Sequence, residues 1–170
     1  MKKVILFFFI SLIGLGNITA QTSNSLQTQD LNVSIDSLST QLSSLQHDYD
    51  FLYCSHEVNL MQLEIRDLIN NIDINSNAIL INCYHGRFDV DLYTAYRDNY
   101  NSILELMNTL KEKTETIQVA VTLKTLTSDF SNEEIEVLMN SCKFLDKCLS
   151  KLQDSSDYYK VVLDIYKDLR

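Results

Sequence analysis

Apolar residues between Ser131 and the C-terminus recur at alternating steps of three and four. The positions are Ile135, Leu138, Cys142, Leu145, Leu149, Leu152, Ser156, Tyr159, Leu163 and Tyr166. This spacing keeps one face of an α-helix apolar, so the sequence predicts one helix over about 132–169. Ser131 comes just before it and Glu134 follows three residues later, which is the pattern of a capping box.

The same spacing occurs upstream and predicts a second helix over about 89–126. Its apolar face comprises Tyr93, Tyr96, Tyr100, Ile103, Met107, Leu110, Thr114, Ile117 and Val121. Asp89 is the expected N-cap, because its carboxylate can accept hydrogen bonds from the first free N–H groups, and Asp91 adds negative charge to the first turn.

The remaining predicted helix comes first in the chain, ends at about residue 82 and has two apolar faces. The first comprises Leu31, Ile35, Leu38, Leu42, Leu45, Tyr49 and Leu52; the second comprises Phe51, Cys54, Val58, Met61, Ile65, Leu68 and Ile72. Two faces predict a helix that lies between two neighbours. The stretch from Asn70 to Asn77 is rich in poor helix formers, so we expect the helix to fray or break there.

Composition supports an all-α class. Beyond residue 20 the chain has Gly86 as its only glycine, and it has no proline or tryptophan, whereas β-proteins need frequent turn residues. Gly86 lies between the first and second helices and is expected to form a left-handed C-terminal cap. A reactive site at Cys83, Tyr84, His85 and Arg87 is the alternative for this stretch. The turn is favoured, because nothing in the sequence indicates an activated thiol.

Two short connections predict an elongated, antiparallel three-helix coiled-coil-like bundle, running up, down and up over residues 44–170. Residues 21–43 then have no counterpart on the second helix and overhang the bundle, either as a projecting helix or as a tether. In the first case Leu31, Ile35, Leu38 and Leu42 form a partner-binding stripe for a protein partner or for a second copy in a homo-oligomer.

The N-terminus predicts export. Lys2 and Lys3 precede an apolar run from Val4 to Ile13, and the segment ends at Ala20, which is typical of a signal peptide over residues 1–20 that is cleaved. We expect a periplasmic or extracellular bacterial protein with no stable membrane span after cleavage. The whole chain has a net charge of −9, and losing both lysines makes it more negative still, which argues against nucleic acid as a partner.

The antiparallel register gathers phenol groups at the end of the bundle near Gly86. The residues are Tyr93, Tyr96, Tyr100, Tyr158, Tyr159 and Tyr166. Aromatic clusters of this kind can bind a sugar, a peptide or a small ligand, although residues at such positions also form ordinary cores.

The same register places Cys54 level with Cys142, which predicts a disulfide between them in an oxidising compartment. Cys83 and Cys148 are expected to stay unpaired, because they fall at different levels. The alternative is that all four cysteines are packed thiols.

No motif indicates catalysis, a metal site or a cofactor. His47, Asp50, Cys54 and Glu57 share one helix face, but one straight helix rarely supplies every ligand of a zinc site. The sequence therefore favours an exported, non-enzymatic helical protein that acts through protein–protein contact or self-association via its N-terminal heptads. The alternative is a binding module that uses the tyrosine-rich end.

Overall fold

The computed structural model describes residues 24–170, with side chains from residue 31 onward. It has three helices: α2 (Asn24–Tyr84), α3 (Val90–Thr127) and α4 (Asn132–Lys167). The predicted all-α three-helix bundle is confirmed. The predicted signal peptide over residues 1–20 lies outside the described residues.

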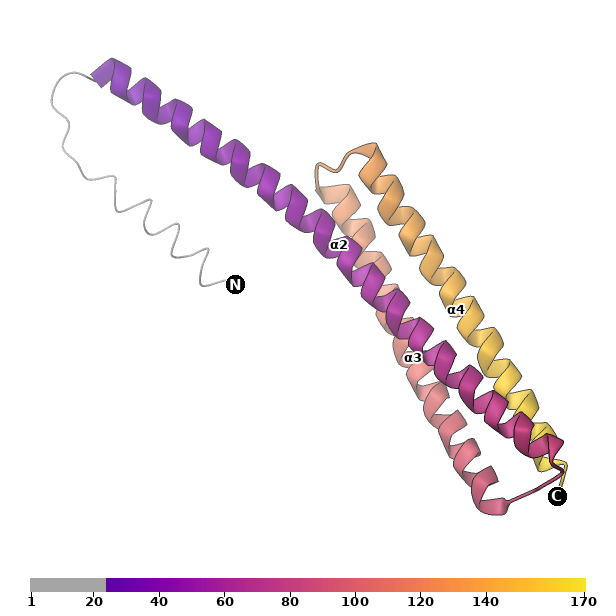
Figure 1. Ribbon diagram of the computed structural model, residues 1–170. Coiled ribbons are helices and arrows are strands. Elements are labelled where there is room, and N and C mark those ends of the chain that lie inside the picture. The colour runs from indigo at the N-terminus through magenta and orange to yellow at the C-terminus, as the bar shows by residue number, and fades with distance from the viewer. Residues whose placement is uncertain (1–23) are drawn as a thin grey trace. The chain divides into compact units, whose positions relative to one another are not determined.

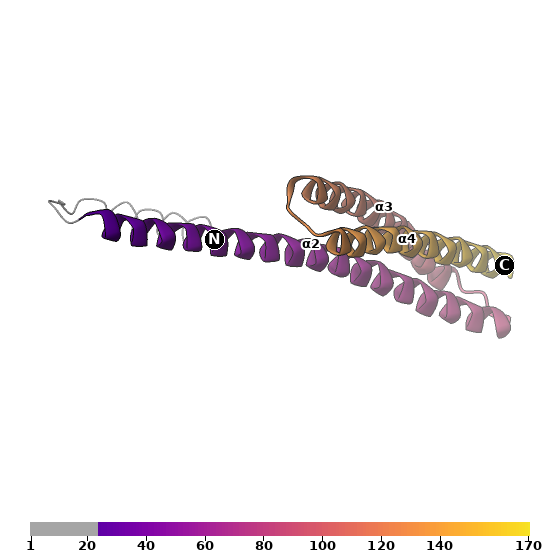
Figure 2. The same ribbon diagram turned by 90° about the horizontal axis from the view of Figure 1, so that it is seen from above.

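The chain divides into two compact units, Met1–Ser44 and Leu45–Arg170. We call the described part of the first, residues 24–44, the N-terminal segment, and we call the second the bundle. Within the bundle, α3 and α4 pack side by side in opposite directions, as two orthogonal views agree (Figures 1 and 2). The C-terminal end of α2 lies at the same end of the bundle as the start of α3 and the C-terminus of the chain (Figure 1).

The bundle core is formed by one face of each helix. On α2 the buried residues include Cys54, Val58, Met61, Ile65, Ile72 and Ile79, which are mostly members of the second predicted face. On α4 they include Leu138, Leu145, Leu152, Tyr159 and Tyr166, and on α3 they include Ile103, Leu110 and Val121. Since the hydrophobic effect scales with the apolar area removed from water, these faces provide the main stabilisation of the bundle.

Polar contacts between the helices fix their register. Lys113 Nζ lies 3.2 Å from Glu64 Oε2, and Asn82 Nδ2 donates to the Tyr96 hydroxyl at 3.1 Å, so α2 and α3 are antiparallel. Gln118 on α3 donates from Nε2 to the Cys142 carbonyl of α4 at 3.1 Å. The bundle therefore runs up, down and up, in the order of the chain.

The helix ends have local causes. The Asp89 carboxylate accepts hydrogen bonds from the N–H groups of Asp91 and Leu92, at 2.8 and 3.1 Å, and starts α3. Ser131 and Glu134 form the capping box that starts α4. After α2, Gly86 has φ +61°, its N–H donates to the Cys83 carbonyl, and the Arg87 N–H donates to the Asn82 carbonyl. These are the two bonds of a Schellman motif, which needs a residue in the left-handed region.

The expected break between Asn70 and Asn77 does not occur, because α2 continues to Tyr84. Ile72, Ser76 and Ile79 are buried in this stretch, so tertiary packing outweighs the weak helix propensity of the asparagines. The Asn75 side chain also donates to the Asn71 carbonyl at 2.8 Å, one turn back along the same helix.

Only one of the two predicted apolar faces of α2 is buried in the bundle. Leu45, Tyr49 and Leu52, which belong to the first apolar face, lie inside the bundle unit but are exposed. The α2 helix does contact two neighbours, since Glu64 meets Lys113 of α3 and His47 meets Glu134 of α4, but neither neighbour covers the first face.

Candidate functional site

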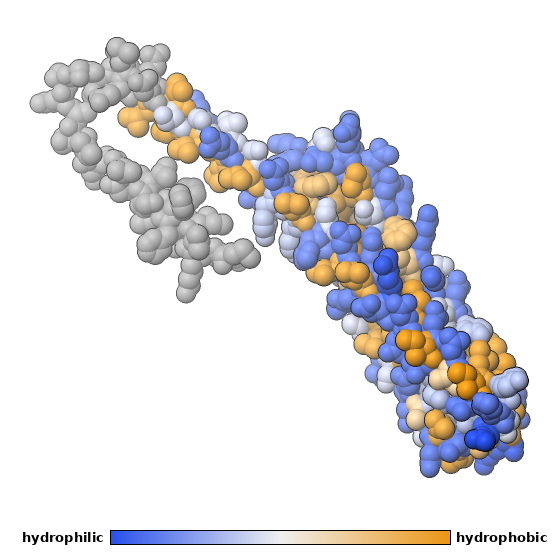
Figure 3. Space-filling view, viewed as in Figure 1, coloured by the Kyte–Doolittle hydropathy of each residue, from blue (hydrophilic) through white to orange (hydrophobic). Residues whose placement is uncertain are grey.

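The N-terminal segment presents apolar side chains to solvent. We call Leu31, Ile35, Leu38 and Leu42 the N-terminal seam. Their exposed fractions run from 54% at Ile35 to 63% at Leu42. Figure 3 shows apolar side chains along this part of α2 on the face that it draws. A row of exposed apolar residues at heptad spacing is typical of a helix that binds another helix.

The surroundings of the N-terminal seam are polar but almost uncharged. Between Leu31 and Gln46 the only charged residue is Asp36. The positions beside the seam are occupied by Asn32, Ser34, Ser39, Gln41 and Gln46. In a coiled coil, charged residues at these flanking positions determine which helices pair. Because this segment has almost no charge there, it does not require an oppositely charged partner and does not repel an identical helix.

The heptad phase continues into the bundle at three further residues, which we call the extension: Leu45, Tyr49 and Leu52. Leu45 and Leu52 are each 66% exposed, and Tyr49 is 53% exposed. Tyr49 stacks on Tyr53 one turn later, with ring centroids 6.2 Å apart and an interplanar angle of 18°. The extension is therefore an ordered apolar surface on the outside of the bundle.

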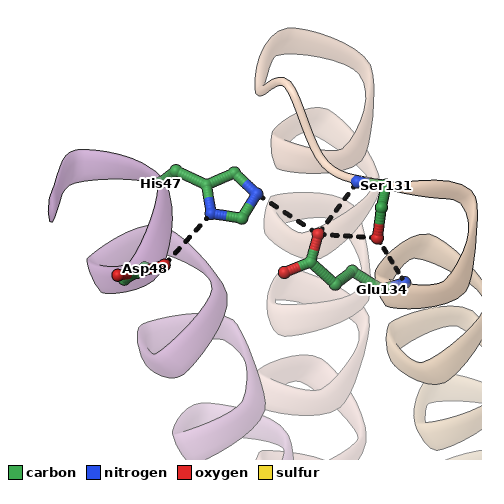
Figure 4. A network of polar contacts seen from close by, with 4 residues as sticks. All are labelled: His47, Asp48, Ser131 and Glu134. Atoms are coloured by element: carbon green, nitrogen blue, oxygen red, sulfur yellow. Dashed lines mark hydrogen bonds and ion pairs between the residues drawn. The ribbon is translucent and has the colours of Figure 1, made fainter. Parts of the chain in front are cut away.

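The opposite face of this turn of α2 is anchored to the rest of the bundle. His47 Nε2 lies 3.2 Å from Glu134 Oε2, and the same oxygen accepts a hydrogen bond from the Ser131 N–H at 2.9 Å (Figure 4). The His47 ring also meets Phe130 edge-on, at 5.4 Å between centroids. The side chain therefore joins α2 to the capping box of α4.

Electrostatics reinforces this anchor. The hydrogen bond to Asp48, together with the charge of Glu134, raises the pKa of His47 above its ordinary value. The Ser131 N–H and hydroxyl lower the pKa of Glu134, and His47 adds to that effect. A second contact lies nearby, where Lys124 Nζ on α3 is 2.8 Å from Asp50 Oδ2. Neither cross-helix contact was predicted from the sequence.

The predicted tyrosine cluster exists, but its rings pack mainly against one another. Tyr159 and Tyr166 are fully buried, and Tyr93, Tyr96 and Tyr100 are half-buried. Tyr100 stacks on Tyr159 with centroids 5.6 Å apart. Of the six residues only Tyr158 is exposed.

The buried phenol groups also have internal hydrogen-bond partners. The Tyr159 hydroxyl donates to the Tyr96 carbonyl at 3.0 Å, and burial raises the pKa of Tyr159. The Tyr166 hydroxyl accepts a hydrogen bond from the Asp89 N–H at 3.0 Å. A shallow depression lined by Asn77, Leu80, Ile81, Tyr84 and His85 contains none of the six. These ring faces and hydroxyls therefore serve the core, which weakens the case for a ligand site.

All four cysteines are thiols in the structure. Cys54 and Cys142 are buried, and burial raises the pKa of both thiols. The predicted disulfide between them stays a prediction. Cys83 and Cys148 are half-buried, and burial raises the pKa of each thiol too.

Over residues 24–170, no helix combines the length and apolar character that crossing a membrane requires. In the same range, no group of three or more His, Cys, Asp or Glu side chains converges as a metal site would require.

No family model, no curated protein sequence and no solved structure matches the chain.

Proposed function

We propose that this is an exported, non-enzymatic protein that acts through protein–protein contact, and that it self-associates through its N-terminal seam. The observation that carries the proposal is the exposure of Leu31, Ile35, Leu38 and Leu42, each more than half open to solvent at heptad spacing. Exposing such a row to water costs free energy. A second helix that covers the row removes this cost.

A second copy of the chain is the partner that the residues support best. The protein is strongly acidic overall, with 23 acidic against 14 basic residues, so two copies repel each other over most of their surface. The N-terminal seam is a region where this repulsion is weak, because the only charge between Leu31 and Gln46 is Asp36. Two identical helices can therefore approach closely here.

Export rests on the sequence of residues 1–20, and the absence of catalysis rests on the lack of any catalytic motif in the chain. The alternative of a ligand-binding tyrosine end gains no support from the packing, because the buried phenol groups already have internal partners. We therefore place the function at the other end of α2.

The test is sedimentation equilibrium of the chain expressed with its leader, with the N-terminus of the purified product determined by mass spectrometry. We expect the wild type to sediment as an oligomer. Leu38→Glu should weaken association about a hundredfold or more, since it removes a Leu from each copy and places two like charges in the interface.

Ser37→Glu is the matched control, because it adds the same charge to an adjacent exposed residue on the side of the helix away from the seam. It should leave the association almost unchanged. Circular dichroism confirms that both variants stay helical. A monomeric wild type, or an equal loss in the two variants, would refute the proposal.

A further inference from the structure

The α4 helix has a second row of mainly apolar residues, on the outside of the bundle. We call it the outer row: Val137, Phe144, Lys151, Tyr158 and Ile165, which follow one another at steps of seven residues. Each member comes one residue before a buried residue of α4, such as Leu145 or Leu152, and therefore points about 100° away from the core-facing direction. The four apolar members are between 46% and 52% exposed. The rest of the bundle therefore leaves them open to another helix.

The outer row is symmetric about its midpoint. Lys151 is the midpoint, the aromatic Phe144 and Tyr158 lie seven residues to either side, and the β-branched Val137 and Ile165 end the row. When two antiparallel copies of one helix are centred on the same residue, positions equally far from it on opposite sides meet. Two copies of α4 centred on Lys151 therefore bring Phe144 against Tyr158 and Val137 against Ile165, twice each. Contact between aromatic rings adds to the gain from burial.

Charge beside the outer row selects the antiparallel direction. Lys147 and Asp154 are exposed and lie on the side of the row away from the core, four residues before Lys151 and three residues after it. In an antiparallel pair this side faces the same side of the other copy, so Lys147 meets Asp154 of the other copy at almost the same level. The two-fold symmetry of the pair repeats this contact of opposite charges.

A parallel pair lacks this match. In it, the side with Lys147 and Asp154 faces the other side of the row on the second copy. That side has the half-buried Cys148 and Ser155 at the corresponding positions, and neither is acidic. Parallel pairing therefore gives Lys147 no carboxylate to bind.

The charges of the outer row are free to make contacts between copies. No ion pair within residues 31–170 includes Lys147 or Asp154. Lys151 meets its own copy at the centre, but its long stem lets the ammonium group extend toward Asp154 of the other copy, about one turn away. Glu133 and Asp168 meet as like charges only at the two ends of the row, where solvent screens them.

We infer that a second copy of this chain docks antiparallel on the outer row of α4, with Phe144 against Tyr158 of the other copy and Lys147 paired with Asp154 of the other copy. The interface lies wholly within the bundle, so it does not require the N-terminal seam. A chain that uses both interfaces has two partner copies, and its association extends beyond the assembly that either interface forms alone.

Charge reversal tests the interface in chains that also carry Leu38→Glu, so that the N-terminal seam does not contribute. Lys147→Glu should weaken association about tenfold or more, because it sets two acidic side chains against each other in two symmetric places. Asp154→Lys should weaken it similarly. The two changes together should restore association, because opposite charges meet again.

Lys160→Glu is the matched control, because it makes the same change of charge at an exposed position on the other side of α4. Sedimentation equilibrium of the full-length chains measures association, and circular dichroism checks that each variant stays helical. Three results would overturn the inference: a Leu38→Glu chain that stays monomeric at the highest concentration, an equal loss in Lys147→Glu and Lys160→Glu, or a double variant that stays weak.

These three results leave the proposed function standing, because it rests on the comparison of Leu38→Glu with Ser37→Glu. The reverse case is also distinct. Association that Leu38→Glu and Ser37→Glu leave unchanged, but that Lys147→Glu weakens and the double variant restores, would support the outer row and refute the proposed function.

Cysteine cross-linking tests the direction of pairing. Phe144→Cys and Tyr158→Cys are made in separate chains and mixed, so that an antiparallel pair sets one new thiol against the other. The unchanged Phe144 and Tyr158 of the same pair still pack together. Mild oxidation of the mixture should give disulfide-linked dimers at several times the yield of either variant alone. Wild type, treated alongside, measures the background from its own four cysteines.

Two outcomes of the cross-linking would overturn the inference. Phe144→Cys that links to itself as well as it links in the mixture would show parallel pairing. A mixture that gives no linked dimer above the wild-type background would show that the outer row is not the interface.

Discussion

Two stripes with the same heptad spacing end in opposite environments. The α4 stripe, which includes Leu138, Leu145 and Leu152, is buried against α2 and α3, whereas the N-terminal seam is exposed along its length. Spacing shows that a helix has an apolar face, but it does not say what covers that face. In the bundle the chain supplies the cover itself, and at the N-terminal seam we propose that a second chain supplies it.

The largest expected effect separates the two stripes directly. Leu145→Ala removes a fully buried side chain and should lower the free energy of unfolding by about 3 kcal/mol at every protein concentration. Leu38→Ala should cost less than about 0.5 kcal/mol in dilute protein, because its side chain is exposed there. At high concentration it should cost more, since it weakens an associated state.

Urea unfolding followed by circular dichroism at two protein concentrations measures both effects. The dilute sample of Leu38→Ala provides the control for the concentrated one. A loss of several kcal/mol for Leu38→Ala in dilute protein would mean that this leucine is buried within a single chain. The two stripes would then not differ in burial.

A smaller effect tests how well the buried stripe is packed. Ser156 lies fully buried in the α4 stripe, and within the described residues its hydroxyl has no hydrogen-bond partner. Ser156→Ala should raise the free energy of unfolding by about 1 kcal/mol, because an unsatisfied buried polar group is removed. The control is Ser150→Ala at an exposed position of the same helix, which carries the same change in helix propensity.

Urea unfolding of Ser156→Ala and Ser150→Ala gives the difference between them. If Ser156→Ala were instead less stable than its control, the hydroxyl would have a partner in solution, and the buried stripe would contain a polar contact that the structure lacks.

The smallest effect concerns the turn of α2 where the exposed and buried faces meet. Since the folded pKa of His47 is raised above 6.5, its contact stabilises the bundle fully below about pH 6.5 and loses that contribution as pH rises through the raised value. The pKa of Glu134 is lowered below 4.5, so its contribution is present above about pH 4.5 and is lost as pH falls through the lowered value.

Thermal unfolding measured from about pH 5 to about pH 9 tests whether the contribution of His47 is lost as pH rises. In the wild type the midpoint should fall slightly as His47 loses its proton, and His47→Gln should flatten that part of the curve. His56→Gln, at an exposed position on the same helix, should keep the wild-type shape. An unchanged pH profile in His47→Gln would show that the contact with Glu134 does not contribute to stability.

Features with local causes could be predicted from the sequence. Gly86, Asp89 and Ser131 each act through hydrogen bonds to residues a few positions away, so composition and spacing were enough to place the turns and caps. The helix class followed from periodicity in the same way. Alignment of the helices also succeeded, because short connections leave little freedom: Tyr100 and Tyr159, which the register placed at one end of the bundle, stack on each other.

Features that depend on the number of neighbours could not be predicted. The first apolar face of α2 reads as another buried face, and only the packing of α3 against α4 reveals that Leu45 and Leu52 remain exposed. The asparagines near Asn75 disfavour a helix by propensity, but buried isoleucines on both sides keep it intact. His47 meets Glu134 because the two residues fall at the same level of the bundle, and the spacing of apolar residues does not indicate which polar side chains meet across helices.

The hydrogen bond between the Asp89 N–H and the Tyr166 hydroxyl closes a sequence separation of 77 residues. The bond from Asn82 to Tyr96 across the same turn spans only 14. During synthesis the shorter contact can form as soon as the first two helices have emerged, whereas the longer one must wait until Tyr166 has been made, since distant contacts require larger loops to close. The start of α3 is therefore fastened only after most of α4 has been made.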